Sequence, residues 1–139
     1  MKTCIFDDIV IGKIPCYRVG ETDEFLAFLD IFPKTKGHTL IIPKKHFRWV
    51  YDIENSSEYW KFTISVTNAI KSALSPVWIN YFTYGAIEHA HMHILPRYET
   101  MNLNDENDIV PSKNISFSKE EFVSISKAIF DEFTKQNKS

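Results

Sequence analysis

Four short apolar runs, each next to turn-forming residues, occupy the first third of the chain. They span residues 4–6, 9–11, 25–29 and 39–42. Runs of this length bounded by glycine, proline or polar residues are typical of β-strands. We therefore expect a strand in each, although residues 5–11 also fit a single helical turn.

Two longer segments repeat their apolar residues at helical spacing. The first begins at residues 55–58, Asn-Ser-Ser-Glu, which fit a capping box, and Pro76 marks its expected end. The second begins at Ser118, which forms a similar box with Glu121. The repeated apolar positions are Tyr59, Phe62, Val66, Ala69, Ile70 and Ala73, and then Phe122, Ile125, Ile129 and Phe133. We expect a long central helix and a C-terminal helix, each with one buried face.

Two further strands are expected between these helices. Residues 77–84 are rich in β-branched and aromatic side chains, and residues 88–95 alternate polar with apolar until Pro96. Strands on both sides of a central helix predict an α+β domain with a mainly antiparallel sheet of about five strands. We assign residues 1–98 to the core of this domain, and residues 99–139 to a polar loop and the C-terminal helix packed on it.

Composition and charge narrow the class of protein. A chain of 139 residues that is 44% hydrophobic has enough apolar material for one domain. The formal charge of −2 provides no basic field for nucleic acid or an anionic membrane, and no stretch is long enough to span a bilayer. The first ten residues lack the pattern of a signal peptide, and only Cys4 and Cys16 are present. We therefore expect a cytoplasmic protein with reduced thiols and with neither nucleic-acid nor membrane partners.

Three of the five histidines are closely spaced, in the sequence His89-Ala90-His91-Met92-His93. On a strand this spacing places all three imidazoles on one face, with Ala90 and Met92 on the other. On a helix His91 would point away from the other two, and the surrounding alternation favours the strand. The expected geometry is a row of imidazoles in front of core residues.

Spacing alone leaves three interpretations of this row open. It can be a polar strand face that is rich in histidine. It can be a metal site, because neutral imidazoles at i and i+2 chelate zinc when a further ligand, here His38 or His46, comes from elsewhere. It can also be catalytic, because a neutral imidazole whose other nitrogen is held by an acceptor can attack phosphorus.

A resemblance to a known family favours the catalytic interpretation. The three histidines, two following apolar residues and then Pro96-Arg97 resemble the signature of the histidine triad family. The first half of the chain agrees with the family's order and spacing at residues 4–6, 12–15, 27–33 and 37–46. The resemblance extends over residues 4–98.

The resemblance implies hydrolysis or nucleotidyl transfer at the α-phosphorus of a nucleotide that carries a leaving group. The substrate class would be a diadenosine polyphosphate, a nucleoside phosphoramidate or an adenylylated metabolite. His91 would be the nucleophile and would form a covalent nucleotidyl-histidine that water then opens. His89, through its main-chain carbonyl, and His93 would orient and support His91. His38 would brace the triad from the neighbouring strand.

The resemblance also assigns the residues that bind the nucleotide. Asp30 would accept hydrogen bonds from the two ribose hydroxyls. Phe6, Leu29 and Ile31 would form an apolar wall for the base, and Asn80 would donate to a phosphate oxygen. From the residues alone, Asp30 equally fits a turn and Asn80 a strand edge.

Two departures from the family pattern change what is expected. Many relatives have a Gly-Gln pair shortly before the first histidine, whereas residues 84–88 here are Tyr-Gly-Ala-Ile-Glu, so the glutamine contact is absent or replaced. Some relatives bind structural zinc through Cys-x-x-Cys, whereas Cys4 is followed here by Asp7. Loss of a thiolate weakens a zinc site, so we predict no tightly held metal and no required cofactor.

The expected partners are a small-molecule nucleotide substrate and, by resemblance, a second copy of the chain in a homodimer. Two other functions remain open at this point. One is a nucleotide-binding regulatory protein with little turnover, and the other is a metal-dependent hydrolase that uses the same histidines.

Overall fold

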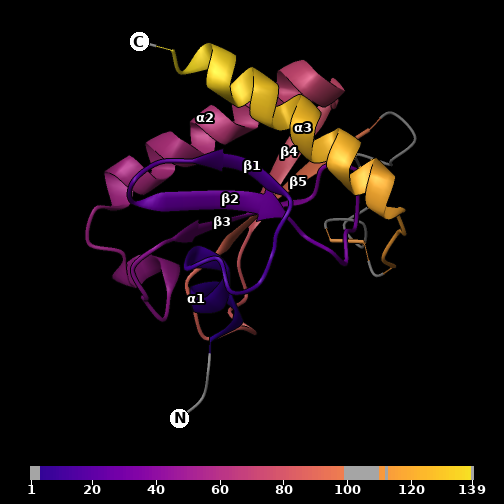
Figure 1. The fold of residues 1–139 in the computed structure, drawn as a ribbon. Coiled ribbons are helices and arrows are strands. Elements are labelled where there is room, and N and C mark those ends of the chain that lie inside the picture. The colour runs from indigo at the N-terminus through magenta and orange to yellow at the C-terminus, as the bar shows by residue number, and fades with distance from the viewer. Residues whose placement is uncertain (1–3, 99–109, 112, 139) are drawn as a thin grey trace.

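The computed structural model describes residues 4–98, 110–111 and 113–138. Within them, five antiparallel strands form one sheet in the order β1-β2-β3-β5-β4 (Figure 1). The elements are α1 (Ile5–Val10), β1 (Arg18–Glu21), β2 (Phe25–Leu29), β3 (Thr39–Pro43), the 3-10 helix η1 (Val50–Asp52), α2 (Ser56–Leu74), β4 (Trp78–Phe82), β5 (Met92–Arg97) and α3 (Lys119–Gln136). The predicted α+β class, with a five-stranded antiparallel sheet and two long helices, is confirmed.

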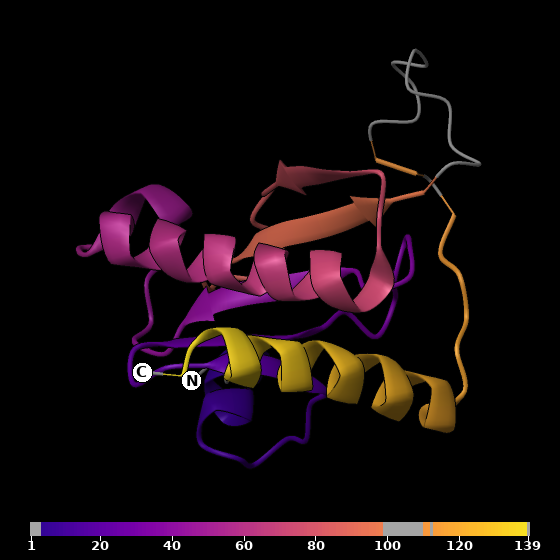
Figure 2. The same ribbon diagram turned by 90° about the horizontal axis from the view of Figure 1, so that it is seen from above.

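The two long helices, α2 and α3, lie side by side on one face of the sheet (Figure 2). Because side chains alternate along a strand, β3 and β5 present Ile41 and Ile94 to these helices. Ile41 and Ile94 pack with Val66, Ile70 and Ile129, and all five side chains are fully buried. This layer is the main hydrophobic core.

The short helix α1 lies on the opposite face of the sheet (Figure 1). Phe6 of α1 packs there with Phe28, Leu40 and other apolar side chains of β2 and β3 in a second, smaller cluster. Strands β2 and β3 are therefore buried on both faces, which explains why they read as continuous apolar runs in the sequence. A helix of six residues covers only part of this face.

The N-terminal strands predicted over residues 4–6 and 9–11 are wrong, because these residues form α1, the helical alternative. Phe6, Ile9 and Val10 are spaced at i, i+3 and i+4, and a helix therefore turns all three toward the sheet. Strand spacing would have placed Phe6 and Ile9 on opposite faces. Burial of one helical face decides between the two interpretations.

The two predicted capping boxes have different outcomes. At α3 the box is confirmed, since Ser118 Oγ accepts from the Glu121 main-chain N–H at 3.1 Å and Glu121 accepts from the Ser118 N–H at 3.0 Å. At α2 it is wrong, because Asn55 makes no side-chain cap and instead donates to Glu24 at 2.6 Å. A carboxylate from a neighbouring loop competes for the Asn55 amide, and local sequence does not reveal it.

The boundaries predicted around proline also differ in outcome. Helix α2 ends as expected before Pro76, with Ser75 in the left-handed region at φ 52°. Strand β5, by contrast, starts only at Met92 and continues through Pro96. Pro96 is tolerated because β3 pairs with β5 only as far as Ile94, so no ladder donor is needed on that side.

The polar loop predicted between residue 98 and the C-terminal helix includes residues 99–109 and 112, which lie outside the described residues. Among the described residues, no helix combines the length and the apolar character needed to cross a membrane.

Candidate active site

His91, just before β5, has a defined arrangement of its two ring nitrogens. Its side chain is buried, and Nδ1 lies 2.8 Å from the main-chain oxygen of His89. A carbonyl can only accept, so Nδ1 carries the proton and Nε2 keeps its lone pair. Burial lowers the pKa of His91, although the hydrogen bond to His89 and the charge of Asp30 oppose this effect. The result is a neutral imidazole with one free basic nitrogen.

His38 and His93 are linked in a hydrogen-bonded chain that starts at the main chain. The N–H of Lys34 donates to His38 Nδ1 at 3.0 Å, so His38 carries its proton on Nε2. That nitrogen lies 2.9 Å from Nδ1 of His93 and donates to it. His93 must then carry its own proton on Nε2, which is buried and has no hydrogen-bond partner among the described residues. The series of hydrogen bonds therefore ends at His93 Nε2–H, a donor that is available to a bound ligand.

Burial keeps the imidazoles of His38 and His93 uncharged. It lowers the pKa of His38 to about 4, with help from the nearby Lys34 charge. It lowers the pKa of His93 to about 3, with further contributions from the neighbouring imidazoles. Phe82 of β4 stacks on the His93 ring at 4.4 Å between centroids and with 11° between the planes. An aromatic side chain thus fixes the ring orientation while the hydrogen bonds fix its proton.

The three triad imidazoles do not form one row on a strand, and this part of the prediction is wrong. His91 and His93 lie close together, with ring centroids 5.1 Å apart. His89 precedes strand β5 in the sequence, and its ring donates from Nε2 to the Pro43 carbonyl at 2.8 Å. Phe6 stands edge-on to both His89 and His91, at 5.8 and 5.3 Å. His89 therefore reaches His91 through its main chain while its ring belongs to a different group.

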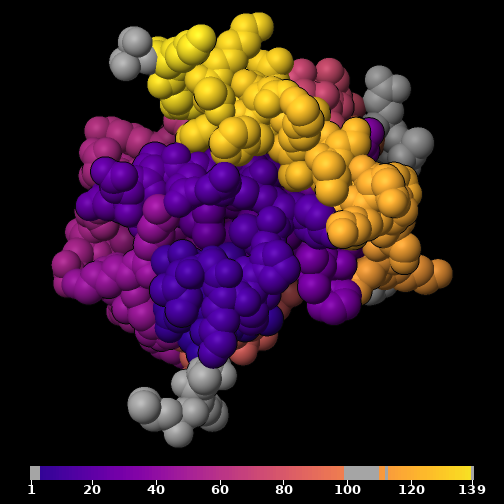
Figure 3. All heavy atoms as spheres, viewed as in Figure 1, coloured from indigo at the N-terminus to yellow at the C-terminus, as the bar shows by residue number. Residues whose placement is uncertain are grey.

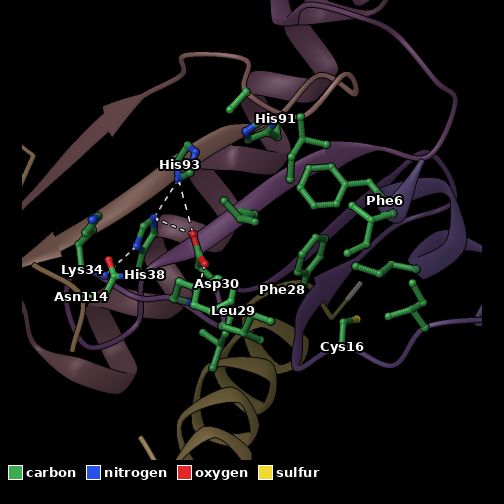
Figure 4. Close-up of a pocket in the computed structure, with 18 of the residues that line it drawn as sticks. Phe6, Cys16, Phe28, Leu29, Asp30, Lys34, His38, His91, His93 and Asn114 are labelled. Carbon is green, nitrogen blue, oxygen red and sulfur yellow. Dashed lines mark hydrogen bonds and ion pairs between the residues drawn. The ribbon is translucent and has the colours of Figure 1, made fainter. Parts of the chain in front are cut away.

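A cavity of about 440 Å³ opens beside His91 and His93 (Figure 4). That volume is in the usual range for a small-molecule site. Its apolar walls come mainly from α1, the end of β2 and the residues just before the triad. Of the residues predicted to contact the nucleotide, Phe6, Leu29, Asp30 and Ile31 line it. Leu29 is at the same time part of the main core, whereas Ile31 is 58% exposed at the rim.

Asp30 combines the two interpretations that its sequence position allowed. One carboxylate oxygen accepts from the Phe32 main-chain N–H at 2.8 Å, which closes a turn at the end of β2. The other lies 3.6 Å from His38 Nε2 and 4.0 Å from His93 Nδ1 (Figure 4). A negative charge is thus held at the cavity wall, next to the imidazoles.

Asn80 is not brought to the cavity. Its side-chain oxygen accepts from the Arg97 guanidinium at 2.9 Å across β4 and β5, and Asn80 is absent from the cavity lining. Arg97 is only 2% exposed and also lies over the Trp78 ring, so it needs a buried acceptor. This arrangement favours the strand-pairing interpretation of Asn80 over a phosphate contact.

Two residues near the triad were not singled out from the sequence. Arg48 donates to the Gly85 carbonyl at 3.2 Å, stacks on Trp49 at 3.6 Å, and has a second guanidinium nitrogen that is buried without a partner among the described residues. Its charge helps to lower the pKa of His91. Tyr84 stacks on His93 with centroids 5.3 Å apart and lines the cavity. Nothing in the local sequence separates Arg48 from the lysines before it.

Comparison with known proteins identifies the chain. A sequence model described as the HIT domain matches residues 12–100. The chain belongs to the histidine triad family. Its relatives include "Protein hit" of Bacillus subtilis, 39% identical over 105 residues that cover 70% of this chain and 72% of that protein. Another is adenosine 5'-monophosphoramidase hnt1 of Schizosaccharomyces pombe, 36% identical over 101 residues that cover 68% and 74%.

A solved histidine triad structure shares the whole fold. It is the hypothetical histidine triad nucleotide-binding protein ST2152 from Sulfolobus tokodaii, with a TM-score of 0.79 and 28% identity, and the match covers 95% of this chain and 93% of that one. The His-x-His-x-His segment of this family is His89 to His93 here.

Among the described residues, two groups of side chains could hold a metal ion. Asp30, His38 and His93 form one group, and Cys4, Asp7, His46 and His89 the other. In the first group, the facing nitrogens of His38 and His93 already share a proton in a 2.9 Å hydrogen bond. The second group combines Cys4 with two imidazoles and a carboxylate. The absence of a tightly held metal stays a prediction.

Proposed function

We propose that this chain is a nucleotide hydrolase or nucleotidyl transferase that acts at the α-phosphorus of a nucleoside derivative through His91. The observation that carries the proposal is the state of His91, whose Nδ1 proton is held by the His89 carbonyl and whose Nε2 is free beside a ligand-sized cavity. Two relatives, in Schizosaccharomyces pombe and Saccharomyces cerevisiae, are named as adenosine 5'-monophosphoramidases, which supports this chemistry at the level of the reaction class.

The reaction would proceed in two displacements at phosphorus. His91 Nε2 forms a bond to the α-phosphorus with its lone pair, and the bond to the leaving group breaks, with its electron pair going to that group. Water then attacks the nucleotidyl-histidine, the phosphorus–nitrogen bond returns its electrons to Nε2, and a nucleoside monophosphate leaves. If the acceptor is another molecule instead of water, the same intermediate gives transfer.

The surrounding residues would stabilise these steps without an added cofactor. The unpartnered N–H of His93 can donate to a phosphate oxygen as negative charge accumulates there. The His89 carbonyl stabilises the positive charge that develops on the attacking His91 ring, because it accepts from Nδ1–H. Arg48 adds a cationic field near His91 that favours an anionic ligand.

The nucleoside would lie along the cavity wall. Phe6 and Ile31 offer apolar contact to the base, with Leu29 behind them at the end of β2. The Asp30 oxygen that does not close the turn would accept from the ribose hydroxyls. With the base and the ribose placed in this way, the α-phosphate would lie next to His91.

The expected partner, apart from substrate, is a second copy of the chain. Strand β4 is an edge strand, and exposed edges of this kind are usually covered. Tyr81 of β4 is 38% exposed, and Trp60 and Ile64 of α2 are 43% and 41% exposed; Trp60 packs edge-on against Tyr81. A homodimer that joins two β4 edges would cover this apolar surface. The cytoplasm is the expected location, because both cysteines are free thiols.

The test is intact-protein mass spectrometry after brief incubation with a diadenosine polyphosphate or an adenosine phosphoramidate. Wild type is compared with His91→Ala and with His93→Asn, which is expected to slow hydrolysis of the intermediate. We expect a nucleotidyl adduct in wild type or His93→Asn and none in His91→Ala. An adduct that persists in His91→Ala would overturn the assignment of the nucleophile.

The two competing functions predict different results in the same samples. No adduct and no turnover, with nucleotide still bound, would indicate a regulatory binding protein. Loss of turnover at saturating substrate after chelation would indicate a metal-dependent hydrolase. Our proposal requires that turnover at saturating substrate survives chelation.

A further inference from the structure

Residues 83–88, the pre-triad loop, form a wall of the cavity that is separate from the nucleoside-binding residues. The loop residues on the cavity are Tyr84, Ala86 and Ile87, and the Tyr84 ring stacks on His93. The wall that would hold the base belongs instead to α1, at the molecular surface (Figure 3, indigo), and to the end of β2. With the nucleoside on that wall, the pre-triad loop borders the group on the other side of the α-phosphorus.

Regular secondary structure does not hold this loop. It lies between β4 and β5 and belongs to no helix or strand of the described structure. At its start, Thr83 Oγ1 donates to the His91 carbonyl at 2.7 Å. At its end, the His89 N–H donates to the Ile87 carbonyl at 2.8 Å. Neither hydrogen bond involves the middle of the loop.

Arg48, in the segment after β3, holds the middle of the loop. Its Nη2 donates to the Gly85 carbonyl at 3.2 Å, and the guanidinium carbon lies 3.6 Å from the centroid of the Trp49 ring. Stacking leaves the edge of a planar guanidinium available for hydrogen bonds, an arrangement that a lysine ammonium cannot reproduce. The Trp49 ring in turn stacks on Tyr51, with centroids 5.8 Å apart and 11° between the planes. The donor to the loop is therefore fixed on a flat aromatic surface.

This contact requires glycine at position 85. Gly85 has a φ of 67°, in the left-handed region that residues with a side chain disfavour. A Cβ atom there would lie 2.4 Å from a ring carbon of Trp49 and 3.4 Å from Arg48 Nη1, so any side chain would push the loop away. Arg48 Nη1 is itself buried without a hydrogen-bond partner among the described residues, which costs free energy. The loop and the guanidinium are thus in close contact even though a donor is left unsatisfied.

We propose that Arg48 is a positioning residue for the first displacement. Through the Gly85 carbonyl it holds the pre-triad loop, so that Tyr84 and Ile87 border the leaving group. This role differs from the cationic field of Arg48, because it depends on the shape of the guanidinium and not on its charge alone. It rests on the proposed function, since it takes His91 to be the nucleophile. Once the leaving group has departed, hydrolysis of the nucleotidyl-histidine should not depend on the loop.

The test is single-turnover kinetics on the full chain, with saturating enzyme in excess over substrate. Quenched samples give the amounts of substrate, nucleotidyl adduct and AMP over time, so that substrate consumption reports the first displacement and AMP formation from the adduct reports the second. Two substrates share the adenylyl group and differ in the leaving group. Diadenosine tetraphosphate releases ATP, and adenosine 5'-phosphoramidate releases ammonia.

Three variants separate position from charge. Arg48→Lys keeps the charge but lacks the planar guanidinium, and Gly85→Ala displaces the loop without changing any charge. Lys45→Gln is the matched control, because it removes a charge from the same segment that pairs with Glu54 instead of the loop.

We expect the defect to be confined to the first displacement. Arg48→Lys and Gly85→Ala should slow consumption of diadenosine tetraphosphate on the order of ten- to a hundredfold, because a small misplacement of a positioning contact can cost that much. Consumption of the phosphoramidate should fall less, because ammonia is too small to reach the loop. AMP formation from the adduct should keep its wild-type rate, and Lys45→Gln should resemble wild type in both steps.

Each outcome decides a different part of the proposal. Wild-type rates in Arg48→Lys would overturn the positioning role and leave only the charge. An equal loss with both substrates, or in both steps, would overturn the role at the leaving group. If wild type forms no adduct and no AMP from either substrate, the proposed function fails and this inference with it. Normal wild-type turnover with unaffected variants removes the inference alone.

Circular dichroism of each variant shows whether a loss reflects unfolding. Gly85→Ala places a side chain at a positive φ and against Trp49, so this variant is the one at risk. Arg48→Lys leaves the backbone unstrained and decides the question if Gly85→Ala does not fold.

Discussion

The two faces of the sheet are built for different purposes. On one face, α2 and α3 cover the strands with a continuous aliphatic and aromatic core. On the other, a six-residue helix leaves room for a cavity bordered by His38, His91 and His93. The buried side chains on the first face are mainly apolar, with a few hydroxyl groups, whereas the second face buries imidazoles, which costs free energy because they are removed from water. The same strands therefore support the stability of the fold on one face and the reactive site on the other.

The alternation of side chains along β5 makes this separation nearly complete. His93 and Ile94 are neighbours in sequence, yet His93 joins the imidazoles and Ile94 joins the core. The same holds in β3 for Leu40 and Ile41, which belong to the two different clusters. Substitutions one residue apart should therefore have different kinds of effect.

The strongest test of this separation is the pair Ile94→Ala and His93→Asn. Ile94→Ala should lower the free energy of unfolding by about 2–5 kcal/mol, because it leaves a cavity in the core, and should leave kcat per folded molecule near wild type. His93→Asn should lower turnover on the order of 10²-fold or more, because the shorter asparagine amide does not reach the position from which Nε2–H donates to phosphate. Denaturant unfolding and turnover are measured on the same preparations. Equal loss of stability in both variants would contradict the separation.

The buried imidazoles should also make stability depend on pH. The pKa values of His38 and His93, about 4 and about 3, are below the ordinary value of 6.5. Between those values the unfolded chain binds more protons than the native chain, so the free energy of unfolding falls as the pH is lowered from about 6.5. Above that pH their contribution is fully present.

Thermal unfolding at stepped pH measures this dependence. Other groups also titrate in acid, so the informative quantity is the difference between wild type and His38→Asn. The variant should show a shallower fall in Tm between pH 6.5 and 4. Parallel curves for the two proteins would show that His38 is not held neutral by the fold.

Asp30→Asn separates charge from turn geometry on the reactive face. Asparagine keeps the oxygen that accepts from Phe32 but removes the negative charge offered to ribose. AMP affinity should fall about tenfold, as expected for a lost hydrogen bond to a charged group of about 1.5 kcal/mol. The preference for AMP over 2'-deoxy-AMP should shrink as well. An unchanged preference would exclude Asp30 from ribose binding.

The smallest effect is expected at the N-terminal end of α3. Ser118→Ala removes the side-chain cap that accepts from Glu121 and should lower the free energy of unfolding by about 1 kcal/mol. Turnover should not change. Glu120→Ala, in the same turn but outside the box, is the matched control for denaturant unfolding, and it should lose less.

Features set by local sequence could be predicted. The spacing of Phe122, Ile125 and Ile129 marks the buried face of α3, and its cap needs only residues three apart. The arrangement of His91 follows from the family pattern because the acceptor, the His89 carbonyl, is two residues away. In each case the deciding contact lies within one or two turns of chain.

Features that depend on distant contacts could not be predicted. The sequence of α1 fits a strand as well as a helix, and only the contact of its apolar face with the sheet decides for the helix. Arg48 gains its position from Gly85, and the cluster at His89 joins Cys4 to a residue 85 positions later. The side chains of Asn55 and Asn80 are likewise held by distant partners, Glu24 and Arg97, which the local sequence does not reveal.

The donor that sets the direction of the imidazole chain is the main-chain N–H of Lys34. Side-chain substitution at residue 34 keeps this N–H, so Lys34→Ala would remove only the side chain, whose charge helps to lower the pKa of His38. Only Lys34→Pro removes the N–H, and it would free His38 to exchange its tautomers. The hydrogen bond that sets the tautomers of His38 and His93 therefore survives any substitution of residue 34 except proline.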